Sequence, residues 1–279
     1  MFDIAISLSP TKTEFGPLLY SGNLDKGLEV IADLVYQGVE LSMLDSNKID
    51  EVWLINKLKK LNLKVYALAT GQSYYTDGYS LFSHDRDNRI KALERLKGHI
   101  DLASKLNAMV IIGGIRGKLH GSLADRKLQK VEGKSVLREC IEYAEDNNVT
   151  LLIEPINRFE TNFINTLKEG TELIDEFGSK NLKLLPDTFH MNIEESSINE
   201  SLIKVKSYIK YIHFADSNRL APGSGHIDFK SIISTLIKIG YRDAIGIEIL
   251  PKPDDWSAAK KSIEFLKSLI CEIKKSSVN

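Results

Sequence analysis

Four short apolar segments in the second half of the chain each carry a residue that can bind a metal ion. They are Glu154 in TLLIE, Asp187 in LKLLPD, His213 in YIHFAD and Glu248 in AIGIEIL. An unpaired charge within an apolar segment costs several kcal/mol, so these side chains need a common partner. Three carboxylates and one imidazole form an oxygen and nitrogen donor set. The sequence therefore predicts a site for one divalent ion, with Mn²⁺ preferred and Mg²⁺ or Co²⁺ as alternatives.

Each of these residues also has an ordinary structural interpretation. A single histidine in a strand is more often a hydrogen-bonded core residue than a metal ligand. A single acid at the end of a strand often caps the next helix. Four such residues in four successive apolar segments are harder to explain separately, and this favours the metal site.

Further polar residues follow three of the four segments within a few positions. They are Glu160, His190 and Arg219. We expect them in loops over the same site, where they would bind sugar hydroxyls or a carbonyl oxygen. Loop capping and surface ion pairing are the alternative roles. The segment 216–229, DSNRLAPGSGHIDF, is long and has no apolar face, as is typical of functional loops.

The elements that must position these residues alternate along the whole chain. Short β-rich apolar segments alternate with stretches of helical periodicity, which indicates repeated βα units around a parallel sheet. The expected strands are 2–8, 38–42, 64–69, 109–113, 150–154, 182–187, 211–216 and 244–250. The clearest helical patterns cover 24–37, 86–107, 135–148, 167–178 and 258–275.

Eight such strands predict an α/β fold, a (β/α)8 TIM barrel, as a single domain spanning residues 1–279. An open doubly wound sheet is the rival, but the first turn, SLSPTKTEFG, lacks the GxGxxG pattern typical of that fold. In a barrel the active site forms at the C-terminal ends of the strands. A carboxylate such as Glu154, which ends a buried strand, is then expected to point into the mouth of the barrel.

Composition limits the possible partners. Lys and Arg together number 37 against 38 Asp and Glu, a formal net charge of -1, so no overall positive field favours nucleic acid. No apolar segment approaches the roughly 18 residues of a membrane span, and the N-terminus lacks a basic region of the signal-peptide type. The two cysteines form no CxxC pair. We therefore expect a cytoplasmic protein with reduced thiols, no membrane partner and no organic cofactor, since no dinucleotide or phosphate-loop signature is present.

The motifs IEPINRFET, DTFHMNIEE, HFADSNRLAPGSGHIDF and IGIEIL resemble those of the sugar isomerase and epimerase superfamily with a xylose-isomerase-like barrel. Within it the chain is most similar to the ketose 3-epimerases of the tagatose and allulose type. The resemblance implies a metal site formed by Glu154, Asp187, His213 and Glu248. It also implies that substrate contacts come from Glu160, His190 and Arg219.

Three further stretches, ATGQSYYTDGYSL, VIIGGIRGK and FETNFINT, look like the branch that epimerises keto-sugar acids such as 5-keto-L-gluconate or tagaturonate. On this resemblance Gln72 and Arg116 join the expected substrate-binding residues. A carboxylated substrate needs a cation, which Arg116, Lys118 or His120 could provide. The alternative is that these are solvated loop residues. The role of His226 stays open.

Epimerising a carbon beside a ketone requires that a proton be removed from one face and returned on the other. Glu154 and Glu248 come from the fifth and eighth expected strands, so they can flank a substrate, and the resemblance implies the same pair of acid/base catalysts. The metal would stabilise a cis-enediolate as negative charge develops.

Three other functions compete with epimerisation of a small sugar or sugar acid. Aldose-ketose isomerases of the same superfamily share the metal and differ in where the proton returns. Apurinic-site endonucleases share the barrel but need a His-rich multi-zinc cluster, and the chain has six His. A non-catalytic sugar-binding barrel is expected to lose one of the two glutamates. A homodimer or homotetramer is compatible with the sequence.

Overall fold

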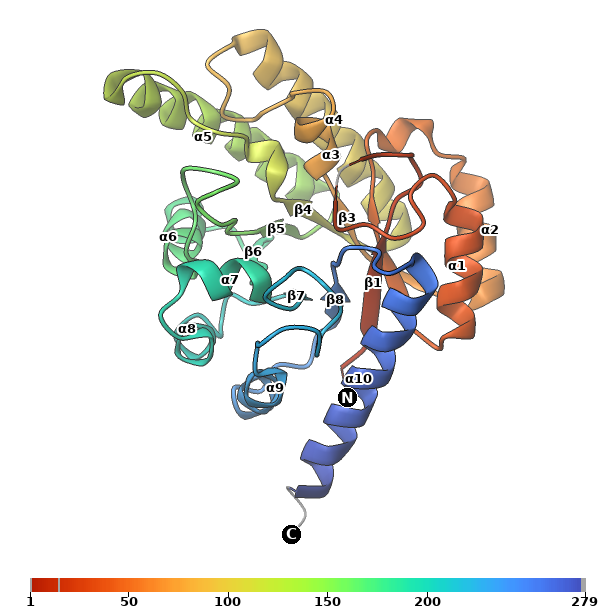
Figure 1. Cartoon of the computed structure of the whole chain (residues 1–279). Helices are drawn as coiled ribbons and strands as arrows, with labels where there is room; N and C mark the ends of the chain where they lie inside the picture. The colour runs from red at the N-terminus through yellow and green to blue at the C-terminus, as the bar shows by residue number, and fades with distance from the viewer. Residues whose placement is uncertain (1, 15, 277–279) are drawn as a thin grey trace.

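The structure, a computed structural model, describes residues 2–14 and 16–276 (Figure 1). Within these residues eight parallel strands form one sheet in the order β6-β5-β4-β3-β2-β1-β8-β7. The strands are β1 (Ile4–Leu8), β2 (Gly38–Ser42), β3 (Lys64–Ala69), β4 (Met109–Ile112), β5 (Leu151–Ile153), β6 (Leu182–Leu184), β7 (Ile212–Phe214) and β8 (Ile245–Ile247).

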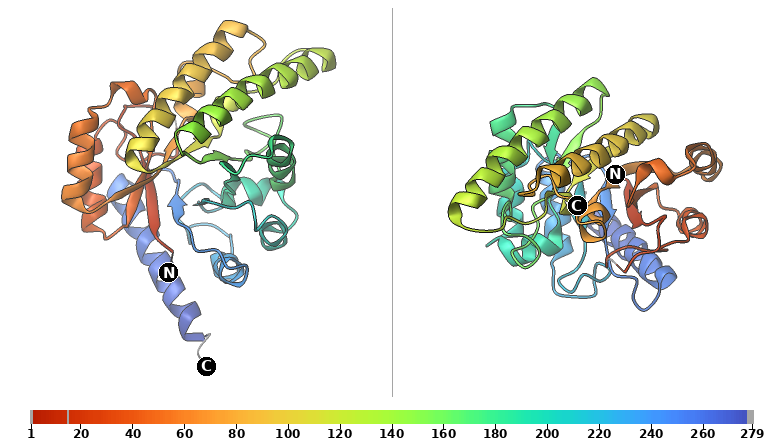
Figure 2. Two further views of the ribbon diagram at one scale, coloured as in Figure 1. Left: turned by 180° about the vertical axis from the view of Figure 1, so that it is seen from behind. Right: turned by 90° about the horizontal axis from the view of Figure 1, so that it is seen from above.

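Helices surround this sheet (Figures 1 and 2). They are α1 (Leu24–Asp33), α2 (Glu51–Leu61), α3 (Gly71–Tyr75), α4 (Arg86–Leu106), α5 (Leu123–Asp146), α6 (Leu167–Phe177), α7 (Thr188–Glu194), α8 (Ile198–Lys204), α9 (Phe229–Lys238) and α10 (Asp255–Ser276). Short 3₁₀ helices are η1 (Ser46–Lys48) and η2 (Gly114–Arg116). In the described ranges, no helix is both long enough and apolar enough to cross a bilayer.

The sheet curls round until its two outer strands, β6 and β7, meet. They are joined by two isolated parallel bridges, Leu184 with Ile209 and Asp187 with His213. The backbone N–H of His213 also donates to the carbonyl oxygen of Pro186 at 2.8 Å. The predicted eight-stranded α/β barrel is therefore confirmed, and β6 and β7 meet at a seam that is held less extensively than the other strand pairs.

Side chains of different sizes fill the inside of the barrel, from alanines to the fully buried Tyr211, and a second, larger set packs between strands and helices. In β3, Ala67 and Ala69 lie in the interior cluster with Ile111, Leu152 and other residues. Leu68 of the same strand belongs to the large core between the sheet and the helices. This alternation follows from the period-2 geometry of a strand, and it makes the barrel a packed core rather than a pore.

The five helical patterns seen in the sequence correspond to α1, α4, α5, α6 and α10. Helix α5 differs from the prediction because it begins at Leu123 rather than at Ser135. Its first half is mostly exposed, including the apolar residues Leu123, Leu128 and Val131, so it has no buried apolar stripe that would reveal a helix. Its start is set by a capping box in which Ser122 and Asp125 each bond the other's backbone N–H, at 3.3 and 2.8 Å. Figures 1 and 2 show α4 and α5 side by side, extending beyond the barrel.

Candidate metal and substrate site

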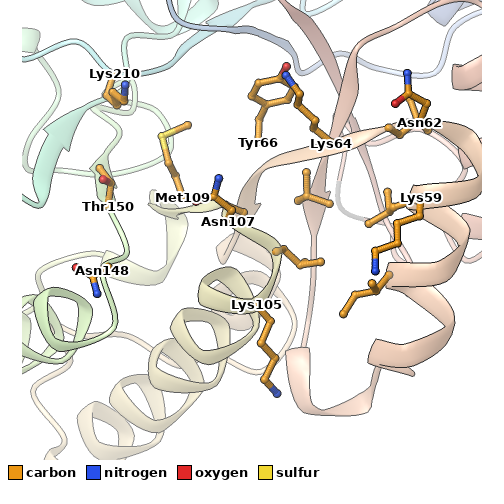
Figure 3. A pocket seen from close by; sticks show the side chains of 16 residues that line it. Lys59, Asn62, Lys64, Tyr66, Lys105, Asn107, Met109, Asn148, Thr150 and Lys210 are labelled. Atoms are coloured by element: carbon orange, nitrogen blue, oxygen red, sulfur yellow. The ribbon is translucent and has the colours of Figure 1, made fainter.

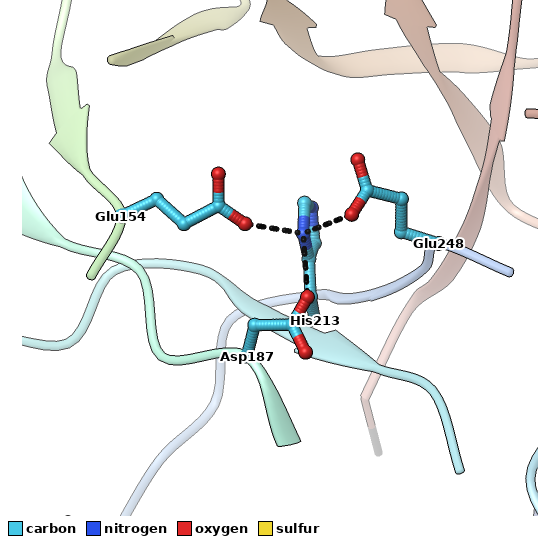
Figure 4. A group of neighbouring side chains, drawn as sticks. All are labelled: Glu154, Asp187, His213 and Glu248. Carbon is cyan, nitrogen blue, oxygen red and sulfur yellow. Dashed lines mark ion pairs between the residues drawn. The ribbon is translucent and has the colours of Figure 1, made fainter. Parts of the chain in front are cut away.

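The four residues predicted to bind a metal converge at the C-terminal ends of the last four strands. Glu154 and Glu248 directly follow β5 and β8, Asp187 precedes α7, and His213 lies in β7. One candidate ligand atom from each residue lies within 4.8 Å of all the others (Figure 4). All four side chains are buried. The fold therefore brings together groups that are far apart in the sequence.

The imidazole of His213 lies at the centre of the group. Its Nδ1 is 3.4 Å from Glu154 Oε1, 3.6 Å from Glu248 Oε2 and 3.7 Å from Asp187 Oδ2. Figure 4 shows the two glutamate carboxylates on opposite sides of the ring. This placement follows from the barrel, because β5 and β8 are separated by β6 and β7 in the barrel wall and so reach its mouth from different sides.

The group fits one divalent cation. Within the described part of the chain, Glu154 Oε1 and His213 Nδ1 are buried and have no hydrogen-bond partner. A buried polar atom without a partner is costly, so both atoms are suited to a metal. Ligands at about 2.1 Å from an ion lie at most about 4.2 Å apart, so small side-chain shifts would complete the shell. Oxygen and imidazole donors suit Mn²⁺, Mg²⁺ or Co²⁺.

Glu40 and Ser7, which the sequence did not identify as site residues, orient the histidine. The Nε2 of His213 lies 2.7 Å from Glu40 Oε2, and Ser7 Oγ donates to Glu40 Oε1 at 2.9 Å. All three side chains are fully buried. Because the proton on Nε2 is directed at Glu40, Nδ1 faces the carboxylates. The signal that could have found Glu40 is its place as the one acid in the short strand GVELS.

The electrostatics of the group also favour a cation. Burial lowers the pKa of His213, but Glu40 and the surrounding carboxylates raise it to well above its ordinary value. In the absence of a metal, a proton on the imidazole thus supplies positive charge that the carboxylates attract. A divalent ion provides more of that charge at the same place.

Arg219 supports two of the carboxylates from the side. Its guanidinium donates to Asp187 Oδ2 at 2.6 Å and forms an ion pair with Glu248. Burial is the largest influence and raises the pKa of both carboxyls, but Arg219 and His213, with His190 for Asp187, together lower it more, so the pKa of each lies below its usual value. Both side chains are therefore ionised and able to bind a metal.

The loop that carries Arg219 is shaped by Asp216, another residue missed by the sequence reasoning. The Asp216 carboxylate accepts hydrogen bonds from the backbone N–H groups of Gly223 at 2.8 Å, Ser224 at 2.9 Å and Ile227 at 3.2 Å. Arg219 itself has a φ of 60°. The segment 216–229 is thus a built loop whose geometry directs the guanidinium into the site.

A cavity of about 160 Å³ lies over the group. Drug-sized ligands usually occupy cavities of about 300 Å³ or more, so this one suits a small polar molecule. The predicted substrate residues Glu160, His190 and Arg219 all line it. The other polar residues of its lining are Glu154, Glu248, Ser42, Thr70 and Tyr75.

Gln72 and Arg116 do not line this cavity, and we correct their expected substrate contact to a structural role. Gln72 is fully buried and donates to Ser9 Oγ at 2.9 Å and to the carbonyl oxygen of Ser42 at 2.8 Å. Arg116 is 1% exposed, and its guanidinium donates to the backbone carbonyl oxygen of Glu154 at 2.7 Å. Burial lowers the pKa of Arg116 to about 10. Arg116 thus holds the backbone of a site residue rather than a ligand.

Three other cations considered from the sequence also lie outside the cavity lining. Lys118 is half-buried and His120 is exposed in the loop after β4. His226 is exposed, and its Nδ1 lies 3.0 Å from Ser217 Oγ. No basic side chain of the loop after β4 therefore lines the cavity.

A larger cavity, of about 810 Å³, lies at the opposite end of the barrel (Figure 3). It is lined by the first residues of β3 and β4, Lys64 and Met109, so it lies at the N-terminal ends of the strands. Three of its four lysines form ion pairs with acids, Lys64–Asp3 at 3.3 Å, Lys105–Glu51 at 2.7 Å and Lys210–Asp243 at 2.6 Å. In TIM barrels this end serves stability and the other end serves catalysis.

Comparison with known proteins agrees with this geometry. The family model of the xylose isomerase-like TIM barrel matches residues 28–269. L-ribulose 3-epimerase of Methylomonas sp. strain DH-1 is 31% identical over 249 residues, covering 86% of this chain and 85% of that protein. The 3-dehydro-D-guloside 4-epimerase of Escherichia coli K12 is 24% identical over 235 residues, covering 80% and 89%.

Among solved structures, one of L-ribulose 3-epimerase superposes with a TM-score of 0.82 at 26% identity, covering 98% of this chain and 96% of that one. The two carbohydrate epimerases match most of the chain, and the barrel model matches a range that includes the four residues of the metal-type group, Glu154, Asp187, His213 and Glu248. The chain therefore belongs to the xylose isomerase-like TIM barrel family.

Proposed function

We propose that this protein is a metal-dependent epimerase that inverts a carbon beside the ketone of a small sugar. The observation that carries the proposal is the pair Glu154 and Glu248, buried on opposite sides of a metal-type group beneath a small polar cavity. The similarity to L-ribulose 3-epimerase supports carbon 3 as the site of inversion. The similarity to a 4-epimerase makes carbon 4 the alternative.

The two glutamates divide the proton transfer between them. One carboxylate removes the proton from the carbon beside the ketone, and the other, after taking up a proton from solvent, delivers it to the opposite face. Arg116 fixes the backbone of Glu154, and Arg219 holds the carboxylate of Glu248, so both acid/base groups keep their positions. A bound divalent ion, held by these two residues with Asp187 and His213, would supply positive charge that stabilises the oxyanion.

The cavity favours a neutral ketose over a keto-sugar acid. Among the described residues that line it, Arg219 is the only lysine or arginine. Its guanidinium is already paired with Asp187 and Glu248. A substrate carboxylate would find no unpaired cation there and would lie close to three glutamates of the lining, which repel it. We therefore narrow the proposed substrates to neutral ketoses such as L-ribulose and D-psicose.

The test is a solvent-exchange experiment. The protein is incubated with Mn²⁺ in D₂O and with L-ribulose, D-psicose, 5-keto-L-gluconate or tagaturonate, and deuterium in the products is located by NMR after chelation of the metal. Deuterium with inversion at carbon 3 of a neutral ketose is the expected result.

Other outcomes of the same experiment revise or reject the proposal. Carbon 4 lies beside the ketone of 5-keto-L-gluconate but not of a 2-ketose, so deuterium with inversion at carbon 4 can be seen only on a keto acid and would move the reaction to that carbon. Inversion of the keto acids alone would restore the acid-sugar prediction, and an aldose product would identify an isomerase. The absence of metal-dependent exchange on all four substrates would contradict an epimerase of this kind and favour a sugar-binding barrel.

A further inference from the structure

Asn157 lies at the centre of a buried hydrogen-bond network beside the cavity. It follows Glu154 in the loop between β5 and α6, and its side chain is 1% exposed. The side-chain oxygen of Asn157 accepts a hydrogen bond from the backbone N–H of Phe159 at 3.0 Å. Because a backbone N–H can only donate, this contact fixes which end of the Asn157 amide is oxygen and which is nitrogen.

The amide nitrogen of Asn157 has two partners, and both line the cavity. It lies 2.8 Å from Glu160 Oε1 and 2.8 Å from His190 Nδ1. An amide nitrogen has two hydrogens and no lone pair to accept a proton. Both partners must therefore be acceptors, so Nδ1 of His190 is unprotonated. The proton of the neutral imidazole then resides on Nε2.

We infer that Asn157 is a positioning residue that sets the hydrogen-bonding roles of His190 and Glu160 toward the substrate. It fixes His190 as a donor through Nε2–H and holds the Glu160 carboxylate as an acceptor. One donor and one acceptor at fixed places match the hydroxyl and carbonyl oxygens of a ketose. The substrate contacts rest on the proposed function, whereas the tautomer of His190 does not.

Packing supports the same assignment. The ring of Phe189 makes an edge contact with His190, with ring centroids 5.4 Å apart, which limits rotation of the imidazole. A histidine that is held in place but has no fixed tautomer would act as donor in one molecule and as acceptor in another. The hydrogen bond from Asn157 removes this ambiguity.

A nearby asparagine provides the contrast. Asn162, in the same loop, exchanges two hydrogen bonds with the backbone of Leu119, at 2.9 and 2.8 Å. Those bonds join two loops and involve no side chain of the cavity. Asn162 is thus a structural counterpart in the same loop with the same side chain, although it is exposed and Asn157 is buried.

The test uses Asn157→Asp, with Asn162→Asp as the matched control. Nitrogen NMR of ¹⁵N-histidine-labelled full-length protein, without metal and then with Mg²⁺, reports which ring nitrogen carries the proton. The spectrum of His190→Gln identifies the signal among the six histidines of the chain. We expect wild-type protein and Asn162→Asp to carry the proton on Nε2. In Asn157→Asp the new carboxylate can only accept a hydrogen bond, so we expect a proton on Nδ1 of His190, which would donate it.

A wild-type His190 protonated on Nδ1 would overturn the inference without any variant. An unchanged His190 signal in folded Asn157→Asp would also overturn it. Neither result depends on turnover, so both are distinguishable from a failure of the proposed function.

Kinetics test the consequence for the reaction. With L-ribulose as substrate, Asn157→Ala should lower kcat/KM by about 10²-fold, the usual effect of misplacing a group in an active site. In a His190→Gln background the same change should cause a smaller loss, because one of the two groups that Asn157 positions is already gone. An equal loss in both backgrounds would contradict the role through His190.

Discussion

The two ends of the barrel both carry clusters of charged side chains, and they differ in how the charges are satisfied. At the C-terminal end the metal-type group is buried. Two of its polar atoms, Glu154 Oε1 and His213 Nδ1, have no hydrogen-bond partner within the described residues. At the N-terminal end three of the four lysines of the larger cavity pair with acids, and Lys105 keeps 51% of its side chain exposed. Water screens such exposed ion pairs strongly, so they contribute little to the free energy of unfolding.

This difference indicates that burial of charged groups, with polar atoms among them that lack hydrogen bonds, distinguishes the candidate functional end better than cavity size does. The cavity at the N-terminal end is about 810 Å³ against about 160 Å³ at the mouth. The smaller one nevertheless lies over Asp187 and His213, whose pKa values are displaced by their surroundings. Perturbed groups of this kind concentrate at functional sites.

The largest expected effect separates the two ends directly. Glu154→Gln and Glu248→Gln should each lower turnover of L-ribulose by at least about 10³-fold, because each change removes an acid/base group and a metal ligand. Glu51→Gln, the same substitution in a pair at the N-terminal end, is the control and should leave turnover unchanged. Steady-state kinetics measures all three. Turnover near the wild-type level in either active-site variant would contradict the two-glutamate mechanism.

A metal ion bound at the mouth of the barrel should stabilise the folded protein. At about 100 times its Kd, Mn²⁺ should raise the free energy of unfolding by about 2.7 kcal/mol and the Tm by several degrees. Asp187→Asn should abolish this shift, while its side-chain oxygen can still cap α7 as the carboxylate does now by accepting from the backbone N–H of Phe189. Thermal unfolding with and without Mn²⁺ measures the effect. An equal shift in both proteins would place the ion elsewhere.

Glu40→Gln tests how the histidine is oriented. The substitution keeps the shape of the side chain and removes the charge that fixes His213 Nε2, so metal affinity should fall by about 10- to 100-fold. Competition with a chelator of known affinity provides the measurement. Ser7→Ala, which removes only the bond to Glu40, should have a smaller effect in the same direction. Wild-type affinity in Glu40→Gln would show that Glu40 has no influence on the ligand.

The smallest effect is expected at the N-terminal end. Lys105→Met breaks an exposed pair with Glu51, so it should change the free energy of unfolding by less than about 1 kcal/mol and leave turnover unaltered. Urea unfolding and steady-state kinetics test both statements. A loss of turnover comparable to that of the glutamate variants would show that this end takes part in catalysis.

Much of the fold was predictable because the strands are buried on both faces and read as compact apolar segments. The candidate metal residues were predictable for the same reason, since a charge that ends such a segment is conspicuous. Glu40 was harder to assign, because the sequence does not reveal whether a side chain in a strand faces the barrel or the helices. The start of α5 was hidden because a solvated helix has no apolar periodicity.

The errors at Gln72 and Arg116 have a different cause. Both follow strands at the catalytic end, as site residues do, but the direction of each side chain depends on local backbone geometry. Arg116 ends the short helix η2, where its guanidinium turns inward to three backbone carbonyl groups. Asn157 was missed because its role depends on contacts with His190, which is remote in sequence. Spacing alone carries no information on such contacts.

The seam between β6 and β7 connects metal binding with the integrity of the barrel. One of its two bridges joins Asp187 to His213, so the side chains on either side of the gap are both candidate ligands. An ion bound by both residues would link β6 to β7 across the least extensively paired junction of the sheet. Any fluctuation that separates β6 from β7 would then have to release the ion, so amide hydrogen exchange along β6 and β7 should slow as metal is added.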